Sequence, residues 1–466
     1  MASLSADPAI LTHGDPIAPV ILGVTSILFF AVVGRFVARK LDQPTVLGEL
    51  LMGIIIGNIA WYLGVDLIAV LREGARVFDV VNLALTGIPI EEVAESVFGS
   101  EKGQEMVRIV TGPKGGQVMQ VAHAVDVFSR YGVIFLLFMV GLDMNLDEMR
   151  QVGADSIRVA IIGVALPFAL GFVVVEVLRP DMSFNSTIFI AATLGATSVG
   201  ISANVLTEMG RLHSREGPII LGAAVCDDIL GLIILAVVSG IVVSGSVDVA
   251  EIVSVIFISS LFLVAAIMLG PAIIRFAANI LGRLDIVEGK MFTSYLFVMV
   301  LAWAANLAGL ATIVGAFAAG TILSDSYFKE HEVSGSKFVS IRELIMPLEV
   351  ILMPIFFILM GIQVKVESFF SWPVVIVASG LLAAAVIGKI VSGFGARSGF
   401  NRLAIGFGMM PRGEVGLVFA AIGRTLGVID DGVFSAIVLM VVITTLVAPP
   451  CLKMALARQM NRRDSS

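Results

Sequence analysis

The sequence has 466 residues, of which 58% are hydrophobic and 14% charged, and its formal net charge is −7. Soluble proteins carry roughly 25% charged residues, so this composition excludes a soluble globular protein, and 30 Lys and Arg spread along the chain exclude a basic nucleic-acid-binding face. The two cysteines, Cys226 and Cys451, stand in apolar runs, which excludes a disulfide framework and a cysteine-rich metal site.

Long apolar runs follow one another along almost the whole chain. A helix that crosses the hydrocarbon layer needs about 20 apolar residues, and runs that are continuous rather than alternating favour helices over a β-barrel. We therefore expect an all-α polytopic membrane protein with about 13 transmembrane helices. The expected spans are 17–40, 44–64, 126–143, 156–178, 185–209, 217–244, 249–283, 290–309, 311–325, 341–363, 372–396, 401–425 and 431–456.

Basic residues near the span ends predict the orientation. Lys and Arg concentrate in short cytoplasmic loops, and here they fall on one side of the membrane if thirteen spans are counted. An odd number of spans puts the two termini on opposite sides, and the basic residues then place the N-terminus outside and the C-terminus in the cytoplasm. The residues concerned are Arg35, Arg39, Lys40, Arg150, Arg158, Arg211, Arg215, Lys337, Arg342, Arg397, Arg402, Lys453, Arg458, Arg462 and Arg463.

The segment 65–125 is the one long break in the hydropathy, because charged residues alternate there with apolar ones. We expect this insert to lie outside the membrane. Its spacing predicts amphipathic helices near 67–82 and 90–111, which would cover the external face or lie in the interface. A packing or dimer-supporting role is the simplest interpretation, and a regulatory ion site is the alternative.

Paired sequence features indicate an inverted repeat, which is the usual origin of such weak internal symmetry in secondary transporters. Residues 138–144 (FMVGLDM) end the third span and residues 358–364 (ILMGIQV) end the tenth. Polar or helix-breaking residues then interrupt the fifth span at 192–200 and the twelfth at 406–416. Corresponding spans are seven apart, and an odd offset reverses the direction of crossing, so the two halves have opposite topology.

Unwound backbone is tolerated at membrane depth only where it faces protein or a water-filled cavity. Two interrupted helices that cross therefore predict an ion site. The alternative is that Gly and Pro only kink the helices or allow close packing, which is less plausible for two stretches in corresponding places.

Two adjacent carboxylates, Asp227 and Asp228, stand near the middle of the sixth span. An ionisable residue there costs about 2.5–3.5 kcal/mol on insertion scales, and two neighbouring acids are not both ionised cheaply in a low dielectric. Protons or a cation must neutralise them. We therefore expect the cation and the protons to compete for this site.

The eleventh span contains Lys389 among Ala, Val and Ile, where a lone lysine must pair or lose its proton. Neighbouring helical residues point about 100° apart, so one aspartate can face a cation cavity while the other faces Lys389. A purely structural Asp–Lys pair would leave one acid in excess.

Four further residues stand in the two interrupted spans. Thr197 and Ser198 offer oxygen donors, which hard cations such as Na⁺ and Li⁺ prefer. Arg412 and Glu414 could pair locally, but a structural role at the helix crossing is favoured, in which Glu414 offsets the positive N-terminal ends of half-helices and Arg412 the opposite ends.

Four parts of the sequence resemble motifs of the cation:proton antiporter-2 family of bacterial sodium/proton exchangers. They are 196–200 (ATSVG), 226–231 (CDDILG), Lys389 and 410–416 (MPRGEVG). The resemblance covers nearly the whole chain except the insert 65–125, which departs from the compact family pattern and puts details of the external vestibule in doubt.

The resemblance implies an Na⁺ (or Li⁺)/H⁺ antiporter and not an enzyme, with no cofactor and no catalytic residue. It makes Asp228 the principal carboxylate for cation and proton, makes Asp227 the partner of Lys389, and so places the transported Na⁺ at Asp227 and Asp228. A paired aspartate with this lysine is typical of the electrogenic subgroup.

For the fold, the resemblance implies a homodimer in a membrane, most simply the bacterial inner membrane, in which a core moves like an elevator against a scaffold. No soluble nucleotide-binding domain is expected. The implied parts are scaffold 1–143, core 144–248, a linker helix 249–284, scaffold 285–364, core 365–458 and a cytoplasmic tail 459–466.

Other functions remain open at this stage. A K⁺/H⁺ antiporter of the same fold is the main alternative, and a cation channel or a sodium-dependent transporter of organic anions is less well supported. An intramembrane aspartyl protease would need its two aspartates on separate helices, whereas Asp227 and Asp228 are adjacent.

Overall fold

The computed structural model describes Asp15 and residues 17–143, 153–209, 211, 214–244, 249–281, 286–331 and 339–463. This part of the chain forms helices and contains no β-strand. The all-α prediction is therefore confirmed.

Nine of the helices in the described part are long and apolar enough to cross a membrane. They are α1 (Ala18–Lys40), α2 (Thr45–Tyr62), α7 (Gly115–Asp143), α9 (Ala154–Leu178), α12 (Gly217–Ser244), α14 (Ile286–Leu307), α16 (Ile341–Ile362), α17 (Trp372–Ser392) and α20 (Asp431–Arg463).

The other four expected spans are one further long helix, one short helix and two interrupted helices. Two of these spans are the single helices α13 (Val249–Leu281) and α15 (Thr312–Ile322). The other two are pairs of half-helices, α10 (Phe184–Thr193) with α11 (Val199–Glu208), and α18 (Arg402–Gly408) with α19 (Glu414–Thr425). Short 3₁₀ helices occupy Asp325–His331, Val366–Phe370 and Gly393–Gly395.

The insert contains four short helices where the sequence suggested two. They are α3 (Asp66–Glu73), α4 (Ala75–Leu85), α5 (Ile90–Phe98) and α6 (Ser100–Thr111). Each expected helix is divided at a glycine with positive φ, Gly74 at 66° and Gly99 at 81°, a conformation that glycine adopts without steric cost. The insert is also shorter than expected, because α7 begins at Gly115 and continues unbroken into the span predicted from 126.

Helix packing follows the inverted repeat. Gly141 and Gly361, the glycines of the paired motifs, occupy equivalent contacts: a Cβ on Gly141 of α7 would overlap the carbonyl oxygen of Phe317 on α15, and one on Gly361 of α16 would overlap that of Leu50 on α2. Small residues allow such close approach between membrane helices. Since the third span contacts the ninth and the tenth contacts the second, the two contacts are related by the offset of seven.

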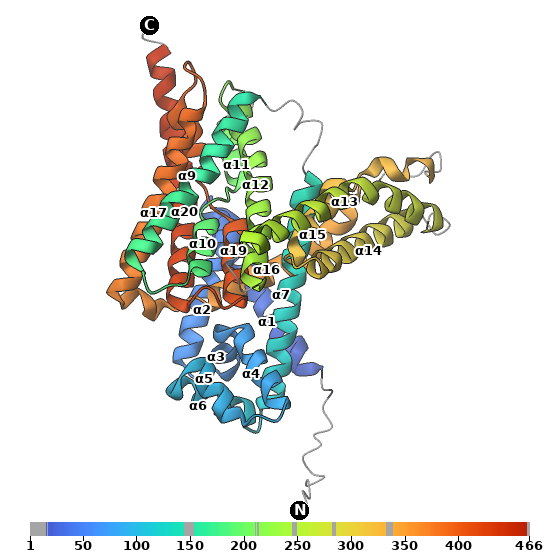
Figure 1. Cartoon of the computed structure of the whole chain (residues 1–466), viewed down its shortest axis with the longest axis vertical. Coiled ribbons are helices and arrows are strands. Elements are labelled where there is room, and N and C mark those ends of the chain that lie inside the picture. Colours follow the sequence, from blue (N-terminus) through green and yellow to red (C-terminus); the bar gives the residue numbers. More distant parts are fainter. Residues whose placement is uncertain are drawn as a thin grey trace, which may run out of the picture.

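The described helices pack in two groups (Figure 1). We call α1, α2, α7 and α14–α16 the scaffold group, and α9–α12 with α17–α20 the core group. In Figure 1, α9, α17 and α20 lie on the left and α13–α15 on the right. The insert lies at the bottom, and the C-terminal end of α20 points to the top. The insert and this end of α20 therefore occupy opposite ends of the molecule.

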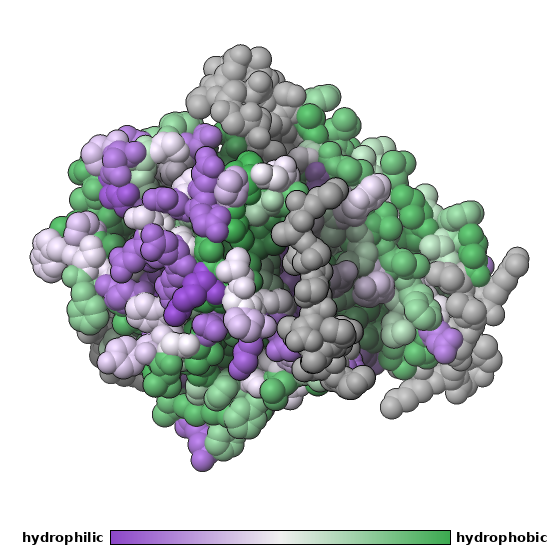
Figure 2. Space-filling model, turned by 90° about the horizontal axis from the view of Figure 1, so that it is seen from below, coloured by the Kyte–Doolittle hydropathy of each residue, from purple (hydrophilic) through white to green (hydrophobic). Residues whose placement is uncertain are grey.

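Large apolar side chains are exposed on the outer helices, among them Phe29 of α1, Met268 of α13 and Trp303 of α14. Figure 2, seen from the insert end, shows polar residues gathered over part of the face and apolar residues around them. An apolar belt around a polar end face is the surface of an integral membrane protein.

Candidate ion-binding site

The two interrupted helices cross through hydrogen bonds between their unwound stretches. The Ser198 N–H donates to the carbonyl of Pro411 over 2.9 Å, and the Thr197 hydroxyl donates to the carbonyl of Met409 over 3.1 Å. Both residues are at most 3% exposed. The Ser198 N–H and the carbonyls of Met409 and Pro411, which the helix breaks release, are thus satisfied within the protein, as the membrane interior requires.

Short polar residues explain where the first half of each interrupted helix begins. Ser183 caps α10, accepting from the N–H of Ser186, and Asn401 caps α18 through the N–H of Ala404, as short polar side chains commonly do. In the second unwound stretch Pro411 has no N–H to donate. A Cβ on Gly413 would lie 2.8 Å from Ser198 Oγ, so a larger residue there would displace the Ser198 side chain.

The Arg412 side chain reaches from one unwound stretch to the other. Its Nη1 donates to the carbonyls of Ala196 at 3.1 Å and Thr193 at 3.4 Å, which belong to the C-terminal end of α10 and the break after it. A cation is favourable beside helix C-terminal carbonyls. Glu414 begins α19, but its side chain lies outside the described part of the structure, so its predicted role stays a prediction.

Lys389 and Asp227 form an ion pair in which both side chains are 0% exposed. Lys389 Nζ lies 2.9 Å from each carboxylate oxygen of Asp227 and donates to the carbonyl of Gly195 over 2.7 Å. Gly195 stands in the unwound stretch after α10. The lysine of α17 therefore joins the aspartate of α12 to the helix crossing.

Asp228 follows Asp227 on α12 and is 6% exposed. Helix α12 packs against α10, α11 and α18, so both carboxylates lie in the core group beside the crossing. The structure thus gathers Asp227, Lys389 and Gly195 in direct contact, with Thr197 and Ser198 in the adjoining stretch. The roles of these residues in ion binding stay predictions.

Gly388 allows Lys389 to reach its partner, because α17 passes close to α9 at this point. A Cβ on Gly388 would lie 2.6 Å from Cγ and 2.8 Å from the backbone nitrogen of Pro167. We expect Gly388→Ala to destabilise the protein by about 1–3 kcal/mol, since overpacking forces helices apart. The thermal unfolding midpoint of the purified protein measures this loss.

Gly231→Ala is the matched control for that variant. Gly231 lies on α12, and a Cβ there would meet nothing within 4 Å. Alanine favours a helix by up to about 1 kcal/mol over glycine, so the midpoint should stay unchanged or rise. Equal midpoints for Gly388→Ala and the unmodified protein would refute the packing argument.

A cavity of about 700 Å³ lies between the two groups of helices. Glu73 and Arg76 of the insert line one part of it, and Val418, Ile422 and other residues of α19 line another. Val418 is four residues after the start of α19, or about 6 Å along the helix axis. The cavity therefore extends from the insert to about one helical turn from the unwound stretch.

Sequence reasoning missed two features of this region. Gly388 carried no signal that distinguished it from the other glycines of apolar spans. The second feature is the contact between three charged residues, Lys365, Arg424 and Asp431. Each stands at the end of an apolar run, which could have marked it for attention, but the tertiary fold alone brings the three together.

A family profile described as "Sodium/hydrogen exchanger, transmembrane" matches residues 26–458. The chain belongs to this family. The resemblance to cation:proton antiporters is thereby confirmed, and the protein is a membrane transporter, not an enzyme.

Curated members of the sodium/hydrogen exchanger family are similar over most of this chain. The protein named "High-affinity Na(+)/H(+) antiporter NhaS3" of Synechocystis is 36% identical over 447 residues, which are 94% of this chain and 90% of that protein. The "Na(+)/H(+)-K(+) antiporter GerN" of Bacillus cereus is 34% identical over 75% of this chain and 88% of its own length.

The fold has a solved counterpart. The sodium proton antiporter MjNhaP1 from Methanocaldococcus jannaschii at pH 8 matches with a TM-score of 0.60 and 17% identity, covering 95% of this chain and 99% of that one. The predicted fold class, a polytopic helical protein with inverted repeats and crossed discontinuous helices, is confirmed.

Proposed function

We propose that this protein exchanges Na⁺ or Li⁺ for H⁺ at a site formed by Asp227 and Asp228. One observation carries the proposal: the buried ion pair of Asp227 with Lys389 beside two crossed, interrupted helices. Asp228 follows on the same helix and is 6% exposed, and we assign it the second carboxylate of the site.

The charges of Asp227, Asp228 and Lys389 explain why a cation and protons would be exchanged at this site. Two carboxylates beside one lysine can hold a cation or protons, but a low dielectric disfavours both loads together. In the arrangement described, Lys389 pairs with Asp227, and we assign the exchanged proton to Asp228. A cation bound by both aspartates would displace Lys389 from Asp227, so cation and protons alternate.

Electrogenic exchange is the finer proposal, because two groups, Asp228 and Lys389, would change their proton while one cation moves. An elevator motion of the core group against the scaffold group would carry this site between the two faces. It is supported by the division into two groups and by the cavity between them.

K⁺/H⁺ exchange is the second candidate. It is favoured by the name of the GerN relative, which includes K⁺ beside Na⁺ and H⁺. A cation of any size that fits oxygen donors could use the same carboxylates, so the choice of ion has to be measured.

We also propose a homodimer in the bacterial inner membrane, with the N-terminus and the insert outside and the C-terminus in the cytoplasm. The basic residues near the span ends support this orientation. The exposed apolar side chains of α1 and α13 offer surface for lipid or for a second copy.

Proteoliposomes with an imposed pH gradient test the proposal. We expect addition of Na⁺ or Li⁺ to dissipate the gradient, and a membrane potential to build up if exchange is electrogenic. Dissipation by K⁺ alone would favour the second candidate. No dissipation by any of the three ions would reject exchange.

A further inference from the structure

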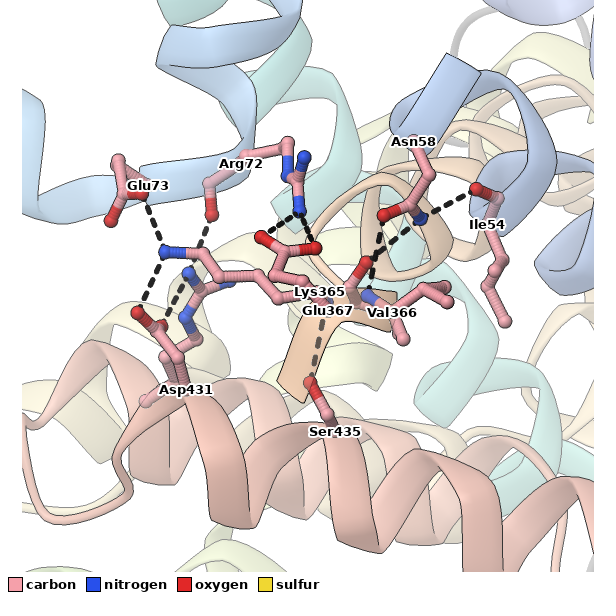
Figure 3. A network of polar contacts seen from close by, with 11 residues as sticks. Ile54, Asn58, Arg72, Glu73, Lys365, Val366, Glu367, Asp431 and Ser435 are labelled. Atoms are coloured by element: carbon pink, nitrogen blue, oxygen red, sulfur yellow. Dashed lines mark hydrogen bonds and ion pairs between the residues drawn. The ribbon is translucent and has the colours of Figure 1, made fainter. Parts of the chain in front are cut away.

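Seven charged side chains meet where the insert contacts the core group (Figure 3). They come from α3 and α4 of the insert, from the segment after α16, and from the ends of α19 and α20. We call this set the insert latch; its members are Arg72, Glu73, Arg76, Lys365, Glu367, Arg424 and Asp431.

Lys365 is the centre of the insert latch. Its Nζ lies 2.5 Å from Glu73 Oε1 and 2.7 Å from Asp431 Oδ2, and its side chain is 4% exposed. Glu73 ends α3, whereas Asp431 begins α20. One buried cation thus connects the insert to a helix of the core group.

Three further contacts join the insert to later parts of the chain, two of them to the core group and one to the short helix Val366–Phe370 that precedes α17. Arg72 Nη2 lies 2.7 Å from Glu367, Arg76 Nη2 lies 2.7 Å from Asp431, and Arg424 Nη2 donates to the carbonyl of Arg72 over 2.5 Å. In each ion pair between the insert and a later part of the chain, the two residues are 292–355 positions apart in the sequence.

The insert is fixed to the scaffold group as well. Helix α3 packs against α2, α7 and α16, and Asn58 of α2 donates to the carbonyl of Val364 over 3.0 Å and accepts from the N–H of Val366. The insert latch therefore connects the scaffold group to the beginning of the segment that leads from α16 into α17. Any sliding between the groups would stretch its ion pairs.

Some of the same residues line the cavity, including Glu73, Arg76 and Arg424. The latch is thus closed in an arrangement whose cavity extends from the insert to α19. Ion pairs between two bodies stabilise only the arrangement in which they can form.

We propose that the insert latch holds the core group in the arrangement whose cavity opens at the insert, and that Lys365 is a positioning residue for transport. The effect on transport rests on the proposed exchange, whereas the latch itself does not. If the latch is broken, a smaller fraction of the molecules accepts a cation from the insert side. Apparent affinity falls with that fraction, and it rises on the opposite side.

The test uses two variants at partly exposed members of the latch, Arg76→Gln and Glu367→Gln, which are less prone to misfolding than a change at buried Lys365. Ala421→Cys on α19 supplies a reporter in the cavity. A membrane-impermeant maleimide is applied to right-side-out and everted vesicles, and the chain without the added cysteine gives the background from Cys226 and Cys451.

We expect each latch variant to slow labelling of the reporter about threefold, the size typical of a partly solvated ion pair. The apparent KM for Na⁺ should rise about threefold on the insert side and fall on the other. A purely structural role would not move the two sides in opposite directions.

Arg130→Gln is the matched control. Arg130 also lines the cavity, but its partner Asp126 lies on the same helix, at i−4, so the variant removes the same charge without touching the latch. Unchanged labelling in both latch variants would overturn the inference, and so would an equal change in Arg130→Gln. If the unmodified protein exchanges no cation, the proposed function fails while the labelling still decides the latch.

Discussion

Asp228→Asn is expected to abolish cation-driven proton movement. Asparagine keeps the size of the side chain but has no ionisable carboxyl group, so position 228 can no longer bind the cation by charge or take up the exchanged proton. Removing one charged partner of a buried binding interaction costs about 2–5 kcal/mol, which corresponds to a loss of about 30-fold or more. The rate of pH-gradient dissipation in proteoliposomes measures this loss for Na⁺, Li⁺ and K⁺.

Asp181→Asn is a control for the removal of a carboxylate from the core group. Asp181 lies in the loop between α9 and α10, where a hydrogen bond from Arg179 lowers the pKa of its carboxyl group. It is therefore ionised at the pH of the assay, and its loss changes the charge as Asp228→Asn does. Exchange should persist in this variant. Full exchange by Asp228→Asn would reject the assignment of the site.

Lys389→Ala is expected to leave exchange in place but remove the build-up of membrane potential. Without the lysine, one of the two groups that change their proton is lost, so each cycle moves one charge fewer. Exchange and potential are measured on the same vesicles, with a pH-sensitive dye and a potential-sensitive dye. A Lys389→Ala protein that still generates the full potential would place charge movement elsewhere.

The same variant should unfold at a lower temperature, because Asp227 would be left buried without its cation, at a cost of about 3–5 kcal/mol. The double variant Asp227→Asn with Lys389→Met removes both charges, and its stability should return toward that of the unmodified protein. The unmodified protein, Asp227→Asn, Lys389→Met and this double variant form a double-mutant cycle. Additive losses would mean that the 2.9 Å contact contributes no coupling.

The spans and the helix breaks could be predicted from the sequence because the membrane imposes them locally. A run of apolar residues must be helical to satisfy its own backbone, and polar or helix-breaking residues within such a run mark where that helix is interrupted. The cost of burying an unpaired charge placed Lys389 beside one of the two aspartates, and the family resemblance identified that aspartate as Asp227. Each of these inferences depends either on residues near one another in the chain or on the large free-energy cost of burying a polar or charged group in the membrane.

The insert was harder to predict, because it lies where the bilayer no longer imposes a rule. Its helix breaks depend on the positive φ of Gly74 and Gly99, and the early start of α7 depends on a helix that continues where the hydropathy falls. The ion pair between Glu73 and Lys365 joins residues 292 positions apart. No local pattern identifies such a partner.

The unequal loops of the two halves have a consequence for the energy of transport. If the halves were identical, exchanging their conformations would convert one end state into the other, and the two would be equally populated. The insert follows α2 with about 50 residues, but just 18 residues separate the end of α15 at Ile322 from the start of α16 at Ile341, and their described part forms the short helix Asp325–His331. This asymmetry removes the degeneracy, so the empty protein should rest preferentially in one orientation while the ion gradients alone still set the direction of net flow.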